Sequence, residues 1–157
     1  RARNADALLP LLADPLRAVR IAAARTLATD AKGIVEERRG AYFRALAEYR
    51  AAQASMADAP AARLNLGMLE EDLGRAEAAE AQYKAALAMD RHFTAARLAL
   101  AEILAARGAF AEAKGILRAG LGLGQEDSVV REALVSLAGR ERAQGRSTPL
   151  APPPGTH

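Results

Sequence analysis

The sequence predicts an all-α fold, an α-solenoid of antiparallel helix pairs, and its repeating pattern is the first reason. Three positions recur every 34 residues: Gly40, Gly74 and Gly108; Ala45, Ala79 and Ala113; and Tyr49, Tyr83 and Leu117. A fixed period of roughly 20 to 50 residues is typical of stacked supersecondary units. Composition is the second reason. Hydrophobic residues make up 51% of the 157, many of them alanine, but aromatic residues only 4%, which favours closely packed helices over a sheet.

Composition also excludes several classes of function. The absence of cysteine excludes disulfides, thiolate metal sites, cysteine nucleophiles and C-x-x-C-H haem attachment within this stretch. No apolar run approaches the roughly 20 residues that span a bilayer. The net charge is +3, and residues 1–50 carry ten Lys and Arg against six Asp and Glu. These basic residues are scattered without an aromatic stacking platform, so solvated helix faces explain them better than nucleic-acid binding does.

Residues 4–29 lie outside the 34-residue pattern. Asp14 suits the cap of a helix and Pro15 its first position, where no amide donor is needed. An apolar stripe at helical spacing follows: Val19, Ala23, Ala24 and Leu27. The run Leu-Leu-Ala-Asp-Pro-x3-Val-Arg with its paired alanines resembles a single HEAT-type repeat. That resemblance implies a helix pair and connector over residues 1–39.

A bridging helix is expected next, from about Ala41 to Met56. The polar residues 30–39 before it should form a connector or a frayed helix start. The expected buried side of the bridging helix consists of Tyr42, Ala45, Leu46, Tyr49 and Ala52. Pro60 then closes this element and opens the following one.

Two complete repeats follow, at residues 60–93 and 94–127. The positions that carry the pattern are Leu66-Gly67, Gly74, Ala79, Tyr83 and Ala86-Leu87 in the first, and Leu100-Ala101, Gly108, Phe110, Ala113, Leu117 and Gly120-Leu121 in the second. This set resembles the tetratricopeptide repeat family, which implies a right-handed α-solenoid. Arginine replaces the expected large aromatic at Arg63 and Arg97, and we expect the arginine stems to cover neighbouring rings while their heads reach water.

A capping helix from about Ser128 to Ala143 should complete the body of the chain, residues 40–144. Its charged outer face suits a terminal element of a solenoid. Residues 145–157 contain four prolines and no periodicity, so a disordered tail is expected there. That tail is either a plain extension or a proline-rich docking ligand.

No pattern of catalytic, metal-binding or cofactor-binding residues occurs. His92 lies in an inter-repeat turn and His157 is the last residue, and neither has a nucleophile or carboxylate suitably placed beside it. The glycines Gly120, Gly122 and Gly124 follow a predicted helix, whose termination explains them. We therefore expect no enzyme activity, cofactor or metal in this segment.

The tetratricopeptide resemblance implies protein binding in a concave groove lined by the first helix of each repeat. The ligand-contacting positions of the family map to Leu64, Asn65, Met68, Glu71 and Asp72 in the first repeat and to Leu98 and Glu102 in the second. This set would suit a helix or extended peptide with apolar anchors and some basic residues. Some members clamp carboxylates with lysines, arginines and asparagines, but only Asn65 matches that clamp. The chain's own N-terminal helices or tail are an alternative occupant.

A second resemblance suggests a different function. The Leu-Leu-Ala-Asp-Pro-x3-Val-Arg run is followed by Glu48-Tyr49-x3-Gln53 and Asn65-Leu66-Gly67. This order is similar to the C-terminal HEAT and tetratricopeptide region of bacterial multihaem cytochrome c-type proteins. It implies a haem-free accessory region of a periplasmic redox protein, whereas a free-standing scaffold would be cytoplasmic. Nucleic-acid binding by the N-terminal third is the weakest alternative and would require a strongly salt-dependent affinity.

Overall fold

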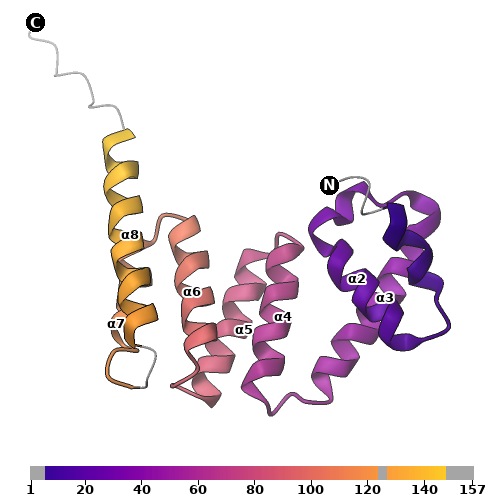
Figure 1. Ribbon diagram of the computed structural model, residues 1–157, viewed down its shortest axis with the longest axis horizontal. Helices are drawn as coiled ribbons and strands as arrows, with labels where there is room; N and C mark the ends of the chain where they lie inside the picture. The colour runs from indigo at the N-terminus through magenta and orange to yellow at the C-terminus, as the bar shows by residue number, and fades with distance from the viewer. Residues whose placement is uncertain (1–5, 124–126, 148–157) are drawn as a thin grey trace, which may run out of the picture. The chain divides into compact units, whose positions relative to one another are not determined.

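The structure is a computed structural model that describes residues 6–123 and 127–147, and these residues contain helices and no strand. The elements in chain order are η1 (Leu9–Ala13), α2 (Arg17–Leu27), η2 (Ala28–Gly33), α3 (Glu36–Ala54), α4 (Pro60–Asp72), α5 (Ala76–Met89), α6 (Thr94–Ala106), α7 (Phe110–Arg118) and α8 (Asp127–Ser147) (Figure 1). The predicted all-α class is confirmed. The chain divides into two compact units, Arg1–Phe93 and Thr94–His157, which are described separately below.

The first unit begins with short helical segments rather than a long helix. The 3-10 helix η1 has Pro10 in its first turn and buries Leu12. Helix α2 begins at Arg17, so Pro15 lies in the preceding turn and not at the first helical position. Asp14 stabilises that turn, since its Oδ1 accepts a hydrogen bond from the Leu16 amide at 2.8 Å.

Helix α3 begins at Glu36, ahead of the predicted start at Ala41. Its first turn carries acidic residues, which the helix dipole favours, and Glu36 Oε2 lies 2.6 Å from Arg39 Nη1. Gly40 therefore lies inside this helix. The glycines one and two periods later, Gly74 and Gly108, end α4 and α6 with φ of 72° and 85°. Gly40, the first glycine of the 34-residue pattern, is therefore helical and does not form a turn.

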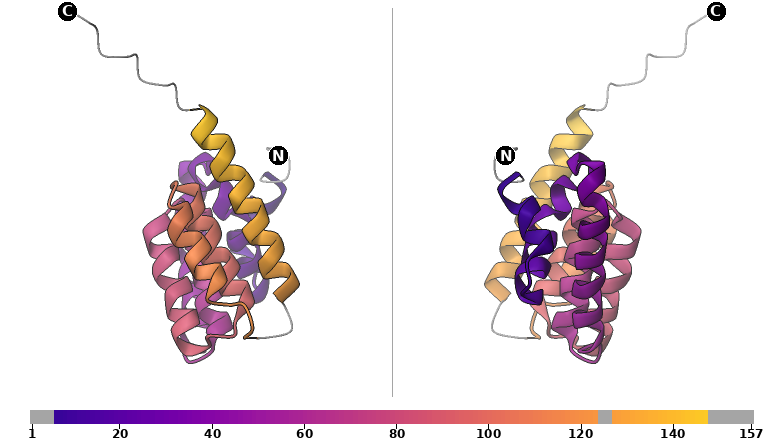
Figure 2. Two further views of the ribbon diagram at one scale, coloured as in Figure 1. Left: turned by 90° about the vertical axis from the view of Figure 1, so that its left-hand side faces the viewer. Right: turned by 90° about the vertical axis from the view of Figure 1, so that its right-hand side faces the viewer.

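The core of the first unit joins α2, α3 and the end of α4 (Figure 2, right). Its largest fully buried members are Leu27, Tyr42, Leu46 and Leu69. Five side chains of α3 were predicted to be buried. Four of them are buried, and the fifth, Ala52, is half-buried.

Helices α4 and α5 pair closely because Gly67 leaves room for the ring of Tyr83. A Cβ built at Gly67 would lie 2.3 Å from Tyr83 Cε1. Tyr83 and Ala79 of α5 are both fully buried. In this repeat a small residue on α4 therefore makes room for a large one on α5.

The second unit consists of α6, α7 and α8 around a core of leucines, with Leu104, Leu117 and Leu137 fully buried. Helix α8 continues to Ser147, past the predicted end at Ala143, and extends beyond α6 and α7 (Figures 1 and 2). The predicted disordered tail begins at residue 145. Residues 145–147 are the last of α8, and residues 148–157 lie outside the described part of the chain.

Arg97 on α6 departs from the expectation for arginines at this repeat position, because its head does not reach water. The residue is 6% exposed, and Nη1 donates to the Ile116 carbonyl at 3.0 Å. Burial lowers the pKa of the guanidinium. Its stem packs against Gly120, where an added Cβ would lie 2.5 Å from Arg97 Cδ. The glycine thus accommodates the arginine, a pairing that the sequence pattern did not indicate.

Candidate functional site

The five predicted groove residues of the first unit all lie on α4, and they differ in exposure. Met68 is 44% exposed, while Leu64 and Asn65 are half-buried. Helix α4 starts at Pro60, whose missing amide donor costs nothing at a helix start. The close contact of Gly67 with α5 orients the helix. Together these features present an apolar side chain, Met68, to solvent.

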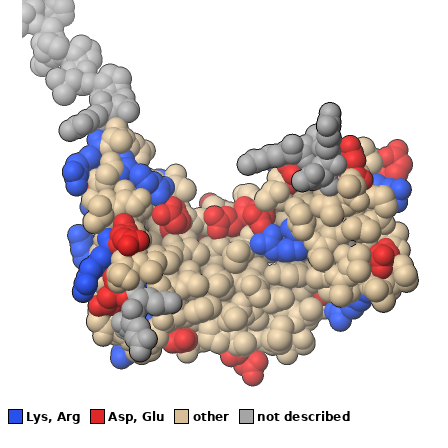
Figure 3. Space-filling model, viewed as in Figure 1, with Lys and Arg blue, Asp and Glu red and all other residues tan. Residues whose placement is uncertain are grey.

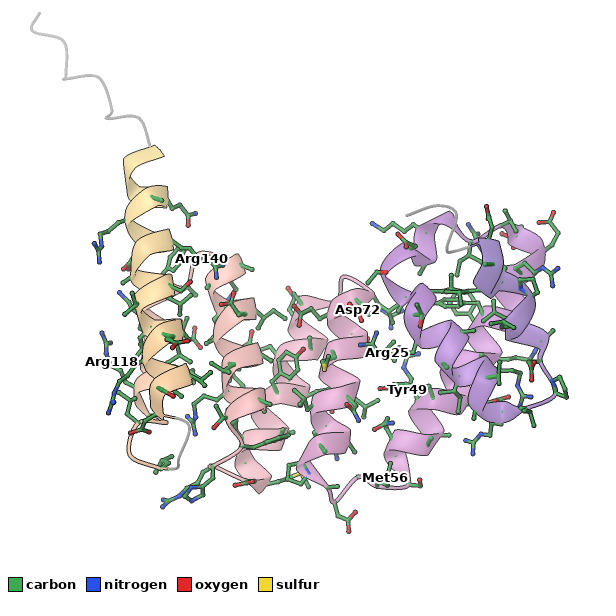
Figure 4. All side chains as sticks on the ribbon, in the orientation of Figure 1. Arg25, Tyr49, Met56, Asp72, Arg118 and Arg140 are labelled. Atoms are coloured by element: carbon green, nitrogen blue, oxygen red, sulfur yellow. The ribbon has the colours of Figure 1, made fainter. Side chains whose placement is uncertain are left out.

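Asn65 is held by contacts with α3. Its Nδ2 donates to Gln53 Oε1 at 3.1 Å, and its backbone carbonyl accepts from the Tyr49 hydroxyl at 3.3 Å. Tyr49 reaches from α3 toward α4 (Figure 4). Because its amide is already paired, Asn65 is a weak candidate for a carboxylate clamp.

The two acidic groove residues of α4 also have partners within the first unit. Glu71 Oε2 accepts a 2.7 Å hydrogen bond from the hydroxyl of Tyr83. Asp72 pairs with Arg25 of α2, and the two side chains point toward each other (Figure 4). Burial and the bond to Glu71 raise the pKa of Tyr83 above its ordinary range. These carboxylates therefore contribute to the packing of the unit as well as to its surface charge.

A charged network continues along α3 and α4. Glu70, next to the groove residues, accepts from Arg50 Nη2 at 2.8 Å and from Arg75 Nη1 at 3.2 Å. On the face shown in Figure 3, acidic and basic side chains are interspersed among uncharged residues. Interspersed charge of this kind indicates neighbouring ion pairs rather than a field of one sign.

Tyr42 lies in the hydrophobic core of the first unit, which joins α2, α3 and the end of α4. The side chain is 1% exposed, and the hydroxyl has no hydrogen-bond partner among the described residues. Burial raises its pKa, against the opposing influence of Arg50, Arg75 and Arg25. At neutral pH the hydroxyl of Tyr42 therefore makes no hydrogen bond that stabilises the fold, unlike the hydroxyl of Tyr83.

Replacing Tyr42 with phenylalanine should leave the free energy of unfolding at pH 7 unchanged or raise it by up to about 1 kcal/mol, because an unpaired buried hydroxyl is removed. Tyr83→Phe should lower it by about 1–2 kcal/mol, because the bond to Glu71 is lost. Urea unfolding of the two variants beside the unmodified chain tests this difference. Equal losses would contradict the assignment of the two hydroxyls.

In the second unit, the predicted groove residues Leu98 and Glu102 lie on α6 beside α8. Both line a hollow of about 420 Å³, together with Leu117 of α7 and residues of α8 that include Val129 and Ala133. Glu102 Oε2 lies 2.6 Å from Nη1 of Arg140, which points from α8 toward α6 (Figure 4). Helix α8 thus neutralises the acidic group that was predicted to face a ligand.

The partners of the groove residues were not predictable from the repeated positions. Gln53 lies on α3 and Arg25 on α2, and neither belongs to the repeated positions. His92, by contrast, lies in the predicted turn, where its amide donates to Asp90 Oδ1 at 2.8 Å. In the described part of the chain, no group of three or more His, Cys, Asp or Glu side chains could hold a metal ion. None of the helices described there has the length and apolar content to cross a bilayer.

Comparison with known proteins identifies one region of the chain. Residues 72–137 match the tetratricopeptide repeat family, over α5, α6, α7 and part of α8. No curated protein and no solved structure matches the chain. Repeats of this family stack helix pairs and mediate protein–protein interaction. Residues 72–137 are therefore similar to tetratricopeptide repeats, and the described part of the chain is all-α.

Proposed function

We propose that the chain is a non-enzymatic interaction module that binds a peptide or helix of a protein partner, or of its own parent chain. The observation that carries this proposal is the tetratricopeptide match over residues 72–137, because such repeats present surfaces to other proteins. The binding faces in this proposal are the first helices of the repeats, α4 in the first unit and α6 in the second.

On α4, apolar contact is the main source of affinity in this proposal. Met68 offers a flexible, solvent-exposed side chain, and Leu64 lies one turn before it. Asn65, Glu71 and Asp72 already have partners within the unit. Because these polar groups are already hydrogen-bonded within the unit, they keep partners when a ligand covers them and displaces water. This limits the cost of desolvation. Their role is then to orient the ligand.

On α6, Leu98 is the proposed contact and Glu102 supports it. The 420 Å³ hollow beside Leu98 has an apolar floor that includes Ala101 and Leu117. Arg140 pairs with Glu102, but Glu132 also lines this hollow, so an aliphatic side chain with a basic neighbour would suit it.

A pair of methionines on different helices of the first unit supplies a matched test. Met68 on α4 is 44% exposed and Met89 on α5 is 41% exposed. A photo-crosslinking amino acid at position 68 should trap a discrete protein in native extract, and the same group at position 89 should not. With that partner purified, Met68→Ala should weaken binding by about fivefold to tenfold, and Met89→Ala should not change it.

Circular dichroism must show unchanged helicity for both variants. Equal weakening by the two variants, or an identical adduct from both positions, would contradict a binding face on α4. The rival proposal, a haem-free accessory region of a periplasmic multihaem cytochrome c-type protein, rests on the sequence resemblance alone. It predicts c-type haem absorption bands in the reduced and oxidised spectra of the natural full-length protein.

A further inference from the structure

A hollow in the first unit lies away from Leu64 and Met68, where α2 and α4 end. Its volume is about 580 Å³, within the range of about 300–1,000 Å³ typical of ligand pockets. Its walls come from three stretches of chain, residues 27–35, residues 72–74 and the N-terminal pair Asp6 and Leu9. We call it the α2–α4 hollow. Of the proposed binding residues on α4, it includes only Asp72.

The floor of the α2–α4 hollow is apolar. Leu27, Ala28 and Ile34 are each at most 4% exposed, and they belong to the core of the unit. Leu73 and Leu9 are half-buried beside them. A ligand entering the hollow therefore meets a hydrophobic surface large enough for an aliphatic chain.

The rim of the hollow carries an excess of acidic side chains. It carries the carboxylates of Asp6, Asp30 and Asp72 against the single ammonium of Lys32. Asp72 is paired with Arg25, whereas Asp6 and Asp30 form no ion pair with a residue that the structure describes. The carboxylates at the rim thus outnumber the cations by one even when Arg25 is counted. The C-terminal ends of α2 and α4 add partial negative charge at the same place.

We propose that the α2–α4 hollow binds a lysine or arginine side chain of a protein partner, together with an aliphatic neighbour in the same peptide. The stem of a basic side chain would lie on the floor at Leu27 and Ile34, and its charged head would reach Asp30 and Asp6 at the rim. Charge complementarity selects this occupant over an acidic or a purely apolar segment. The hollow is wider than one side chain requires, which leaves room for the neighbour. This inference goes beyond the proposed function, since it concerns a second contact outside the open face of α4.

The experiment titrates the complete 157-residue chain, labelled with ¹⁵N, with a capped Gly-Leu-Lys-Leu-Gly peptide at low ionic strength. Control peptides carry norleucine or glutamate in place of lysine. Amide shifts should concentrate at residues 28–34 and 72–74. The glutamate peptide should bind on the order of tenfold more weakly, and added salt should reduce this preference.

Three variants make the test specific to the hollow. Asp30→Asn should weaken binding of the lysine peptide by about threefold to tenfold, and Lys32→Gln should tighten it by a similar factor, because both change only the rim charge. Asp58→Asn makes the same charge change at an exposed position outside the hollow, and it should leave the affinity unchanged.

Several results would overturn the proposal. These are equal binding of the lysine and glutamate peptides, the absence of shifts at residues 28–34, or equal weakening by Asp30→Asn and Asp58→Asn. Shifts confined to Leu64 and Met68 would also overturn it while supporting the proposed binding face on α4. Conversely, loss of partner crosslinking at Met68 with intact shifts at residues 28–34 would overturn that face and leave the hollow supported. The two proposals can therefore fail independently.

Discussion

Replacing Gly67 with alanine is expected to lower the free energy of unfolding by about 2 kcal/mol or more, because the new methyl group has no room. Its Cβ would lie 2.3 Å and 2.5 Å from two ring carbons of Tyr83. That ring cannot easily move away, since it is fully buried and its hydroxyl is bonded to Glu71. The expected gain in helix propensity, about 0.5–1 kcal/mol, is smaller than this cost.

Gly40 provides the matched control for this substitution. It also lies inside a helix of the first unit, but the nearest atom to an added Cβ is the end of the Arg44 side chain at 3.5 Å. Gly40→Ala should therefore raise the free energy of unfolding by about 0.5–1 kcal/mol. Urea denaturation followed by circular dichroism measures both variants. Stabilisation by Gly67→Ala would show that α4 and α5 can separate without cost.

Above pH 10, the free energy of unfolding is expected to fall with rising pH, and Tyr83 should account for a separable part of that fall. Burial and the bond to Glu71 raise the pKa of Tyr83 in the folded chain, so the unfolded chain loses this proton first. The stabilisation is complete below the unfolded pKa of about 10 and is lost as the pH rises toward the folded pKa. The slope from one such group is at most about 1.4 kcal/mol per pH unit.

Tyr83→Phe should remove this contribution. Its unfolding free energy should therefore be lower than that of the unmodified chain at pH 7 and should approach it as the pH rises to 11 and above. Tyr42→Phe should also reduce the alkaline slope, because burial raises the pKa of Tyr42 in the same direction. Guanidinium unfolding at several pH values between 8 and 11.5 measures the slopes. Parallel curves for Tyr83→Phe and the unmodified chain would contradict a raised pKa at Tyr83.

Much of the fold could be predicted from the spacing of small and large residues. Gly67, Ala79 and Tyr83 are positions of the repeat, and the structure packs Tyr83 against Gly67 and buries Ala79 completely. The turns at Gly74 and Gly108 also follow from local chemistry, because a positive φ favours glycine. Gly40 occupies the same place in the period without a turn, which shows that spacing alone does not distinguish a turn glycine from a helical one.

The candidate site was less predictable because its chemistry depends on partners on other helices. Position within a repeat indicated that Asn65, Glu71, Asp72 and Glu102 face one side of their helices. It could not indicate that three of them are paired with Gln53, Arg25 and Arg140, which come from other helices. Each pairing reduces the charge or hydrogen-bonding capacity left for a ligand.

Helical periodicity, small residues at close approaches and glycines at turns are local properties, so the amino-acid order was enough to predict helix pairs and their repeat. The environment of Arg97 and the acidic α2–α4 hollow are not local properties. They arise where separate segments meet: Gly120 makes space for Arg97, and the ends of α2 and α4 bring Asp30 and Asp72 to one rim. Burial and the proximity of charges depend on that meeting, and only the folded chain brings these segments together.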